Sequence, residues 1–207
     1  NVSVTTSTFF IDNFHFYNFT FFGNRMGKLS LKQSKGLCLM HVAIAVLTIL
    51  ASFKWGIWKN WRKYHASMLF IATGGFLYEY IVKENTLWKF HPDFLYGQEM
   101  VVIVYALITM PVSIFLFLSH FPERWFQRVI YILLWSGIYI SVEWLLYVFG
   151  RISYQNGWGM WYSFLFDIVM FSVIALHQFK PFRAYILSLF IIIFLISYFE
   201  IPFKFTE

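Results

Sequence analysis

Four ionisable side chains lie inside long apolar runs and are the first candidates for chemistry: His41, Glu79, Glu143 and Asp167. Glu143 is the only charged residue in the run VIYILLWSGIYISVEWLLYVFG. A carboxylate that faces lipid inside a bilayer costs about 2–3 kcal/mol or more, so we expect it to face the protein interior, pair, or stay protonated. Such groups conduct protons or cations, act as acid and base in catalysis, or fix the packing of helices.

Counting along the apolar runs at ~1.5 Å per residue places all four groups within roughly 5–10 Å of the same membrane boundary. The connecting segment YQNGWGMW, residues 154–161, is expected to lie over this layer. We therefore predict one polar pocket, made by His41, Glu79, Glu143, Asp167, Tyr154 and Asn156. In it, the Glu143 carboxyl should face inward and meet a polar side chain of another helix, such as Asp167, Glu79, His41 or Tyr78.

A second interpretation assigns these groups to packing alone. Glu79 and Glu143 would then be protonated and bonded to tyrosine or backbone groups, and Asp167 would pair with Arg151 or His41. The residue types do not separate the two interpretations.

The elements that position these groups follow from composition. Of 207 residues, 59% are hydrophobic, 24% aromatic and only 13% charged, whereas a soluble domain is about half apolar and a quarter charged. This predicts an integral membrane protein. One cysteine excludes an internal disulfide, no spacing resembles a zinc site, and we predict no metal or cofactor.

Six apolar runs, each near the ~20 residues that cross hydrocarbon as a helix, predict an all-α bundle of about six transmembrane helices. The runs cover residues 37–53, 66–82, 100–119, 129–149, 161–177 and 184–201. Pro111 should kink the third run. Short loops should make consecutive helices neighbours. The bundle is expected to span residues 37–203 as one domain, after an N-terminal extension at 1–36 that is disordered, interfacial or a mis-assigned start, and before a short tail at 204–207.

The basic residues should contact anionic lipid headgroups, because they fall between the apolar runs; nucleic acid is not an expected partner. Eight gather at the ends of runs that meet one boundary: Lys54, Lys59, Arg62, Lys63, Arg124, Arg128, Lys180 and Arg183. The remaining eight lie at the other boundary or before the first run, and the bias marks the first set as cytoplasmic only if translation begins at Met40. His65, His120 and His177 also lie on the first side, with a spacing that is not specific for a metal.

The stretches KWGIWKNWRKYHASMLF, LWKFHPD, YILLWSGIYISVEW and YQNGWGMWYSFLFDIVMF, followed by LHQFKP, resemble an uncharacterised family of small multipass membrane proteins from spore-forming bacteria such as bacilli and clostridia. The resemblance covers roughly residues 40–203. It implies a bacterial cytoplasmic membrane, and it implies no activity or site residues. A fainter similarity, carried by Glu143 and Asp167, is to small carotenoid-cyclase domains, whose Pro-Glu-Glu type motif this chain lacks.

Three functions remain open, because no motif specific for catalysis or transport occurs in the chain. The favoured one is a non-enzymatic structural or accessory membrane component. The second is a small transporter or ion-coupled protein that uses the carboxylate layer. The third is a lipid- or isoprenoid-modifying enzyme with Glu143 and Asp167 as acid and base, which would need an apolar groove open to lipid beside a carboxyl group.

Overall fold

The computed structural model describes residues 39–82, 85–92 and 97–201. The chain divides into two units, Asn1–Leu37 and Cys38–Glu207, and everything below concerns the second. The extension expected at 1–36 and the tail expected at 204–207 lie outside the described residues.

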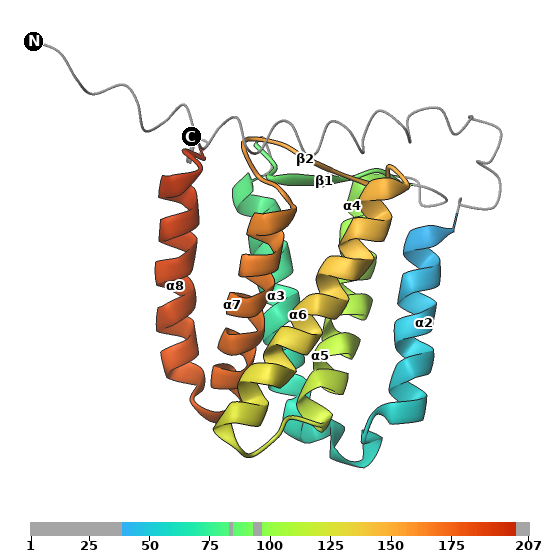
Figure 1. Ribbon diagram of the computed structural model, residues 1–207, viewed down its shortest axis with the longest axis vertical. Helices are drawn as coiled ribbons and strands as arrows, with labels where there is room; N and C mark the ends of the chain where they lie inside the picture. The colour runs from blue at the N-terminus through green and yellow to red at the C-terminus, as the bar shows by residue number, and fades with distance from the viewer. Residues whose placement is uncertain (1–38, 83–84, 93–96, 202–207) are drawn as a thin grey trace, which may run out of the picture. The chain divides into compact units, whose positions relative to one another are not determined.

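The second unit is an all-α bundle, as the apolar runs predict (Figure 1). In chain order its elements are α2 (Met40–Trp55), the 3-10 turn η2 (Trp58–Asn60), α3 (Trp61–Val82), α4 (Gln98–Val104), the π-turn η3 (Tyr105–Thr109), α5 (Met110–Ser119), α6 (Trp125–Val148), α7 (Met160–Phe179) and α8 (Pro181–Tyr198). The start of α2 and the end of α8 lie at the same end of this unit (Figure 1).

Not every predicted run makes an independent span. Within the described part of the chain, four helices are long and apolar enough to cross a membrane alone: Gln98–Ser119, Trp125–Val148, Met160–Phe179 and Pro181–Tyr198. The first two runs qualify only together, as a pair bent by 95°. The reason is length and composition: α2 has 16 residues, about 24 Å at 1.5 Å per residue, and α3 opens with the polar segment WRKYH.

The third run is interrupted where Pro111 was expected to disturb it. Proline has no N–H and its ring crowds the carbonyl four residues earlier. The helix responds with a π-turn, η3, just before the proline: the Met110 N–H donates to the carbonyl of Tyr105, five residues back. Such turns commonly occur at functional sites, and Tyr105 and Met110 both line the cavity described below.

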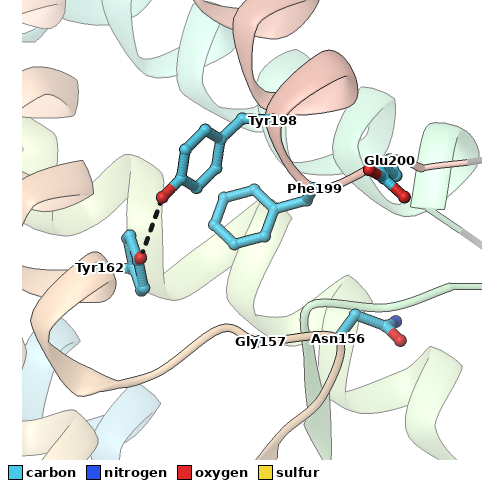
Figure 2. A pocket seen from close by; sticks show the side chains of 6 residues that line it. All are labelled: Asn156, Gly157, Tyr162, Tyr198, Phe199 and Glu200. Atoms are coloured by element: carbon cyan, nitrogen blue, oxygen red, sulfur yellow. Dashed lines mark hydrogen bonds between the residues drawn. The ribbon is translucent and has the colours of Figure 1, made fainter. Parts of the chain in front are cut away.

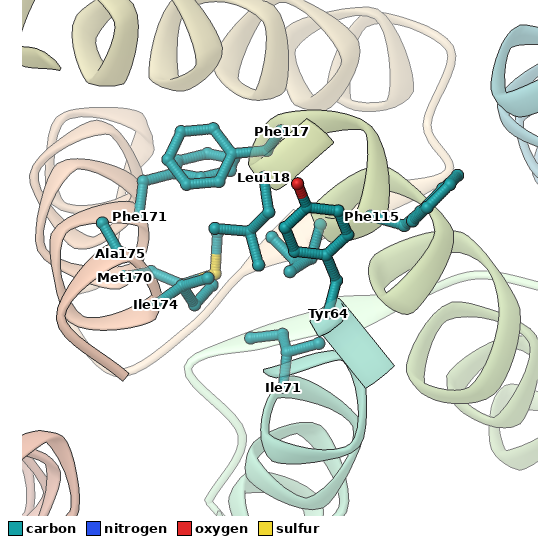
Figure 3. Packing of buried hydrophobic residues seen from close by; sticks show 10 residues of the cluster. Tyr64, Ile71, Phe115, Phe117, Leu118, Met170, Phe171, Ile174 and Ala175 are labelled. Atoms are coloured by element: carbon teal, nitrogen blue, oxygen red, sulfur yellow. The ribbon is translucent and has the colours of Figure 1, made fainter. Parts of the chain in front are cut away.

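Helix α5 is the centre of the bundle. Its sequence MPVSIFLFLS is apolar on every face, which is typical of a buried helix. Ile114, Phe115 and Phe117 are 0% exposed, and they pack with side chains from α3 and α7, including Tyr64 and Phe171 (Figure 3). Close packing of this kind leaves few voids.

Consecutive helices are neighbours in only part of the bundle. The expectation holds for α6, α7 and α8, which pack in sequence. It is wrong for α2 and α3, which both pack mainly on the α4–η3–α5 helix. The chain turns between them at Gly56, where an added Cβ would overlap the Phe115 ring and the Ser52 carbonyl. A turn that needs glycine therefore directs α3 away from α2.

A small antiparallel sheet closes one end of the bundle. Strand β1 (Trp88–Phe90) pairs with β2 (Ile152–Tyr154), with Trp88 opposite Tyr154 and Phe90 opposite Ile152. The apolar runs did not predict it, because strands of three residues are too short for a visible alternation. The sheet joins the loop after α3 to the loop after α6 (Figure 1).

Candidate functional site

A cavity of about 380 Å³ lies inside the bundle, on the side of α5 that faces α2 and α6. Helices α2, α5, α6 and α7 and the π-turn η3 line it, and residues of β1 and β2 close it. Most of its lining is aliphatic or aromatic, while Glu143 and Asp167 supply its carboxyl groups. The volume falls within the roughly 300–1,000 Å³ of small-molecule sites, which share this mixture of apolar walls and a few polar groups.

The Glu143 carboxyl is held by a strand residue. Tyr154 donates its hydroxyl to Glu143 Oε1 at 2.7 Å, and the Tyr154 ring stacks on Tyr147 of α6, with the centroids 5.3 Å apart. Burial, and then the adjacent Glu143 carboxylate, raise the pKa of Tyr154, so this phenol remains a donor at neutral pH. Ser163 of α7 also interacts with the Glu143 carboxyl group, so the expected polar partner on another helix is present, although it is none of the residues named from the sequence. The bond from the sheet was not predicted.

Asp167 is a polar residue of the cavity wall with an incomplete set of hydrogen bonds. Its residue is only 6% exposed and it lines the cavity. Among the described residues, its Oδ2 atom has no hydrogen-bond partner. Burying an unbonded polar atom is costly, and native proteins contain few of them.

His41 ties the start of α2 to the sheet end of the bundle. Its ring is 0% exposed; Nε2 lies 3.1 Å from the His91 carbonyl and Nδ1 lies 3.2 Å from the Tyr105 hydroxyl. Because a carbonyl only accepts, Nε2 carries the proton, and in neutral imidazole Nδ1 accepts from the tyrosine. His41 therefore borders the site through Tyr105, which lines the cavity, and does not form part of its wall.

Glu79 and Asn156 do not join the predicted pocket. Glu79 is partly exposed on α3 and is not one of the residues that surround the cavity. Asn156 is exposed and donates from Nδ2 to the Thr86 carbonyl at 3.1 Å. Residue counting gives depth along a helix but not the direction in which a side chain points, which is why these two were grouped with the others.

Asn156 lines a separate, shallower hollow of about 320 Å³ (Figure 2). Its other walls are Gly157, Tyr162, Tyr198, Phe199 and Glu200. The hydroxyls of Tyr162 and Tyr198 lie 3.2 Å apart and link α7 to α8. Residues predicted to form a single pocket thus line two separate hollows: Glu143 and Asp167 line the large cavity, and Asn156 lines the shallow one.

Two further polar contacts at the large cavity were not predicted from the sequence. Trp158 is buried and donates its indole N–H to Ser163 Oγ at 2.9 Å, and Ser113 bonds the Tyr139 hydroxyl. The spacing of Ser163 and Asp167, four residues apart on α7, would have placed both on one helical face. Ser113 offered no comparable signal, because its partner lies on another helix.

At the opposite end, the structure forms a polar contact that was also missed. Ser67 Oγ lies 2.9 Å from His177 Nδ1 and donates to Gln178 Oε1 at 3.1 Å. His177 Nε2 lies 3.2 Å from the Tyr185 hydroxyl. His177, expected at the interface, is instead only 4% exposed, and it connects α3, α7 and α8.

The eight basic residues expected at lipid headgroups lie at the ends of helices or in adjacent turns, at the end of the bundle away from the sheet. Arg128 differs from the others: it is only partly exposed, it donates to the Pro122 carbonyl at 3.0 Å, and its guanidinium lies over the Phe121 and Phe179 rings. The other seven are exposed: Lys54, Lys59, Arg62, Lys63, Arg124, Lys180 and Arg183.

Comparison of the chain with protein-family models, with curated proteins and with solved structures finds no match.

Proposed function

We propose that the protein is a multi-pass membrane protein whose six helices all cross the bilayer of a bacterial cytoplasmic membrane. Large apolar side chains on the outside of the bundle support this proposal: Leu189, Phe190 and Phe194 of α8 are 58%, 64% and 61% exposed. Lipid tails are a favourable environment for such an apolar surface, whereas its exposure to water would be costly. The bent α2–α3 pair then forms two crossings, with the short α2 adapted by tilt or by local thinning of the bilayer.

The basic end is the cytoplasmic end in this proposal. Among the described residues, Lys89 and Arg151 are the basic groups at the sheet end, against the eight at the other end. Positive charge in short loops favours the cytoplasmic side and attracts anionic lipid.

Within this frame, the protein is a non-enzymatic accessory component that holds an apolar or amphipathic small molecule taken from the bilayer. The observation that carries the proposal is the cavity's side opening. Leu47 of α2 and Ile138 of α6 both line the cavity, yet they are 64% and 45% exposed. The mouth therefore lies between α2 and α6, where a lipid-like molecule can enter without crossing water.

Photolabelling tests this function. The purified protein, in nanodiscs of phosphatidylcholine, is irradiated with a dodecanol that carries an alkyl diazirine, and the labelled residues are mapped by mass spectrometry. We expect labels on cavity residues of α6 and α7. Ala51→Phe, which fills the cavity from α2, should remove these labels, whereas the matched change Leu189→Phe on the outer face of α8 should not. Equal labelling of the cavity in both variants would reject the function.

The orientation has its own test. Single cysteines are placed at Lys59 and Lys89 in a chain whose native cysteine is replaced by serine. A membrane-impermeant maleimide should reach Lys89→Cys from outside intact cells and Lys59→Cys only after the cells are opened. Labelling of both from the same side would mean that α3 does not cross the membrane.

A second candidate function follows from the unequal surroundings of the two carboxyl groups. Glu143 is bonded to Tyr154, whereas Asp167 Oδ2 is unbonded among the described residues. Such differences let one carboxyl group act as acid and the other as base, as a lipid- or isoprenoid-modifying enzyme would require. A chemically altered product of a bound lipid, seen by mass spectrometry and lost in Glu143→Gln, would favour this candidate.

A further inference from the structure

We propose that the cavity selects a cationic amphiphile, a hydrocarbon chain that ends in an ammonium group, and that Asp167 binds the ammonium. This inference rests on the proposed function, because it names the chemical class of the molecule held between α2 and α6.

The first support is a pair of carboxyl groups that have no basic partner in the described part of the cavity wall. The cavity wall contains two carboxyl groups, Glu143 and Asp167, and no lysine, arginine or histidine among the described residues that line it. In a site of low polarity, an ionised carboxyl group would repel an anionic headgroup, whereas a bound cation would stabilise the ionised form of the carboxyl group. The charges of the site therefore discriminate between headgroups.

The second support is the unbonded Asp167 oxygen. Asp167 lines this cavity and is only 6% exposed, and its buried Oδ2 atom has no hydrogen-bond partner among the described residues. An ammonium N–H is the strong donor that a carboxylate oxygen takes in a buried site. Glu143 is already engaged on one oxygen by Tyr154 at 2.7 Å, which fixes this carboxyl group close to the site and makes Asp167 the principal contact.

The third support is the aromatic wall at the same end of the cavity. Trp88, Trp158 and Phe166 line the cavity and lie against one another, with centroid distances of 5.1 Å for Trp88–Trp158 and 6.2 Å for Trp158–Phe166. The Trp158 ring is held in place by its bond to Ser163. Aromatic faces attract ammonium groups, most strongly where water is excluded.

The aliphatic part of the cavity suits the chain of such a molecule. From the mouth at Leu47 and Ile138, the wall continues through Ile44, Leu116 and Met170. The carboxyl groups and rings thus meet the head of the ligand while aliphatic side chains meet its tail. In this arrangement the headgroup lies inside the protein, whereas at a bilayer surface it remains in water.

Competition among three probes of equal chain length tests the proposal. Dodecylamine, dodecanol and dodecanoate each compete with a photoreactive dodecylamine for cavity labelling, in nanodiscs of phosphatidylcholine at pH 7. We expect the amine to compete at a concentration at least about tenfold lower than the alcohol, and the carboxylate not to compete. The variant Asp167→Asn should raise the concentration at which the amine competes by about tenfold and leave that of the alcohol unchanged. Because each probe is compared between variants, its partitioning into lipid cancels.

Glu79→Gln is the matched control, because it removes a carboxyl group at similar depth that does not line the cavity. It should leave competition by all three probes unchanged. If Asp167→Asn affects amine and alcohol alike, or if Glu79→Gln weakens the amine as much, the cationic class is rejected while ligand binding stands. If neither the photoreactive amine nor the photoreactive alcohol labels the cavity, or if Ala51→Phe leaves their labelling unchanged, the proposed function fails as well.

Discussion

The two ends of the bundle bury polar groups in opposite ways. At the basic end, Ser67, His177 and Tyr185 form a continuous set of contacts across three helices. At the sheet end, Glu143 has a phenol partner, but Asp167 Oδ2 has none among the described residues. The first arrangement gives each of these side chains a polar partner. The second leaves one buried carboxyl oxygen without a donor among the described residues.

The two ends also differ in how closely their apolar side chains pack. Around α5 and α7 near the basic end, Phe115, Phe117 and Phe171 are 0% exposed and interlocked, whereas between α2 and α6 about 380 Å³ stays open. A filled core stabilises the fold, and an open cavity sacrifices contacts that the fold could otherwise make. The contrast places the packing that stabilises the fold and the cavity of the proposed ligand in different halves of the bundle.

The largest expected effect tests the filled half. Phe117→Ala should lower the free energy of unfolding by about 3–5 kcal/mol, because it removes a fully buried ring and leaves a void. Phe166→Ala, beside the existing cavity, should lower it by less. Unfolding in a detergent titration measures both, and equal losses would break the contrast between the halves.

The second-largest effect on the free energy of unfolding is expected at Glu143. Glu143→Leu should destabilise the protein by about 2 kcal/mol, since it leaves the Tyr154 hydroxyl without its acceptor. Glu143→Gln keeps an acceptor oxygen and should lose less than half of that. The same unfolding titration separates them, and equal stability of the two variants would mean that the bond does not hold the sheet to α6.

Ser67→Ala should have a smaller effect, about 1 kcal/mol, because a single hydrogen bond contributes about this much to stability. It removes the link to His177. Ser172→Ala is the control: Ser172 is exposed and bonds only the Ile168 carbonyl one turn earlier among the described contacts. A loss as large in the control would contradict the role assigned to the Ser67–His177 contact.

The smallest effect should be at Asp167. In the ligand-free protein, Asp167→Asn should change the free energy of unfolding by less than about 0.5 kcal/mol, because Oδ2 has no bond within the described structure to lose. A loss of about 2 kcal/mol or more would reveal a structural role. It would also remove the difference between the two ends on which the ligand proposal depends.

The amino-acid sequence by itself determined the helical class and the depth of the ionisable groups along the bundle. Long apolar runs allow only helices in a bilayer, and a constant rise per residue converts position in a run into depth. His41, Glu143 and Asp167 accordingly lie toward the sheet end. There, the His41 ring contacts the carbonyl of His91, which directly follows β1, and Glu143 contacts Tyr154 of β2.

Only the tertiary structure decided which of these groups face the same space. Rotation about a helix axis and the choice of neighbouring helices depend on packing around α5, on the turn at Gly56 and on the π-turn before Pro111. These features turn Glu143 and Asp167 into the cavity and leave Glu79 outside it. Depth depends on one chain's own geometry, whereas direction depends on contacts between segments distant in sequence.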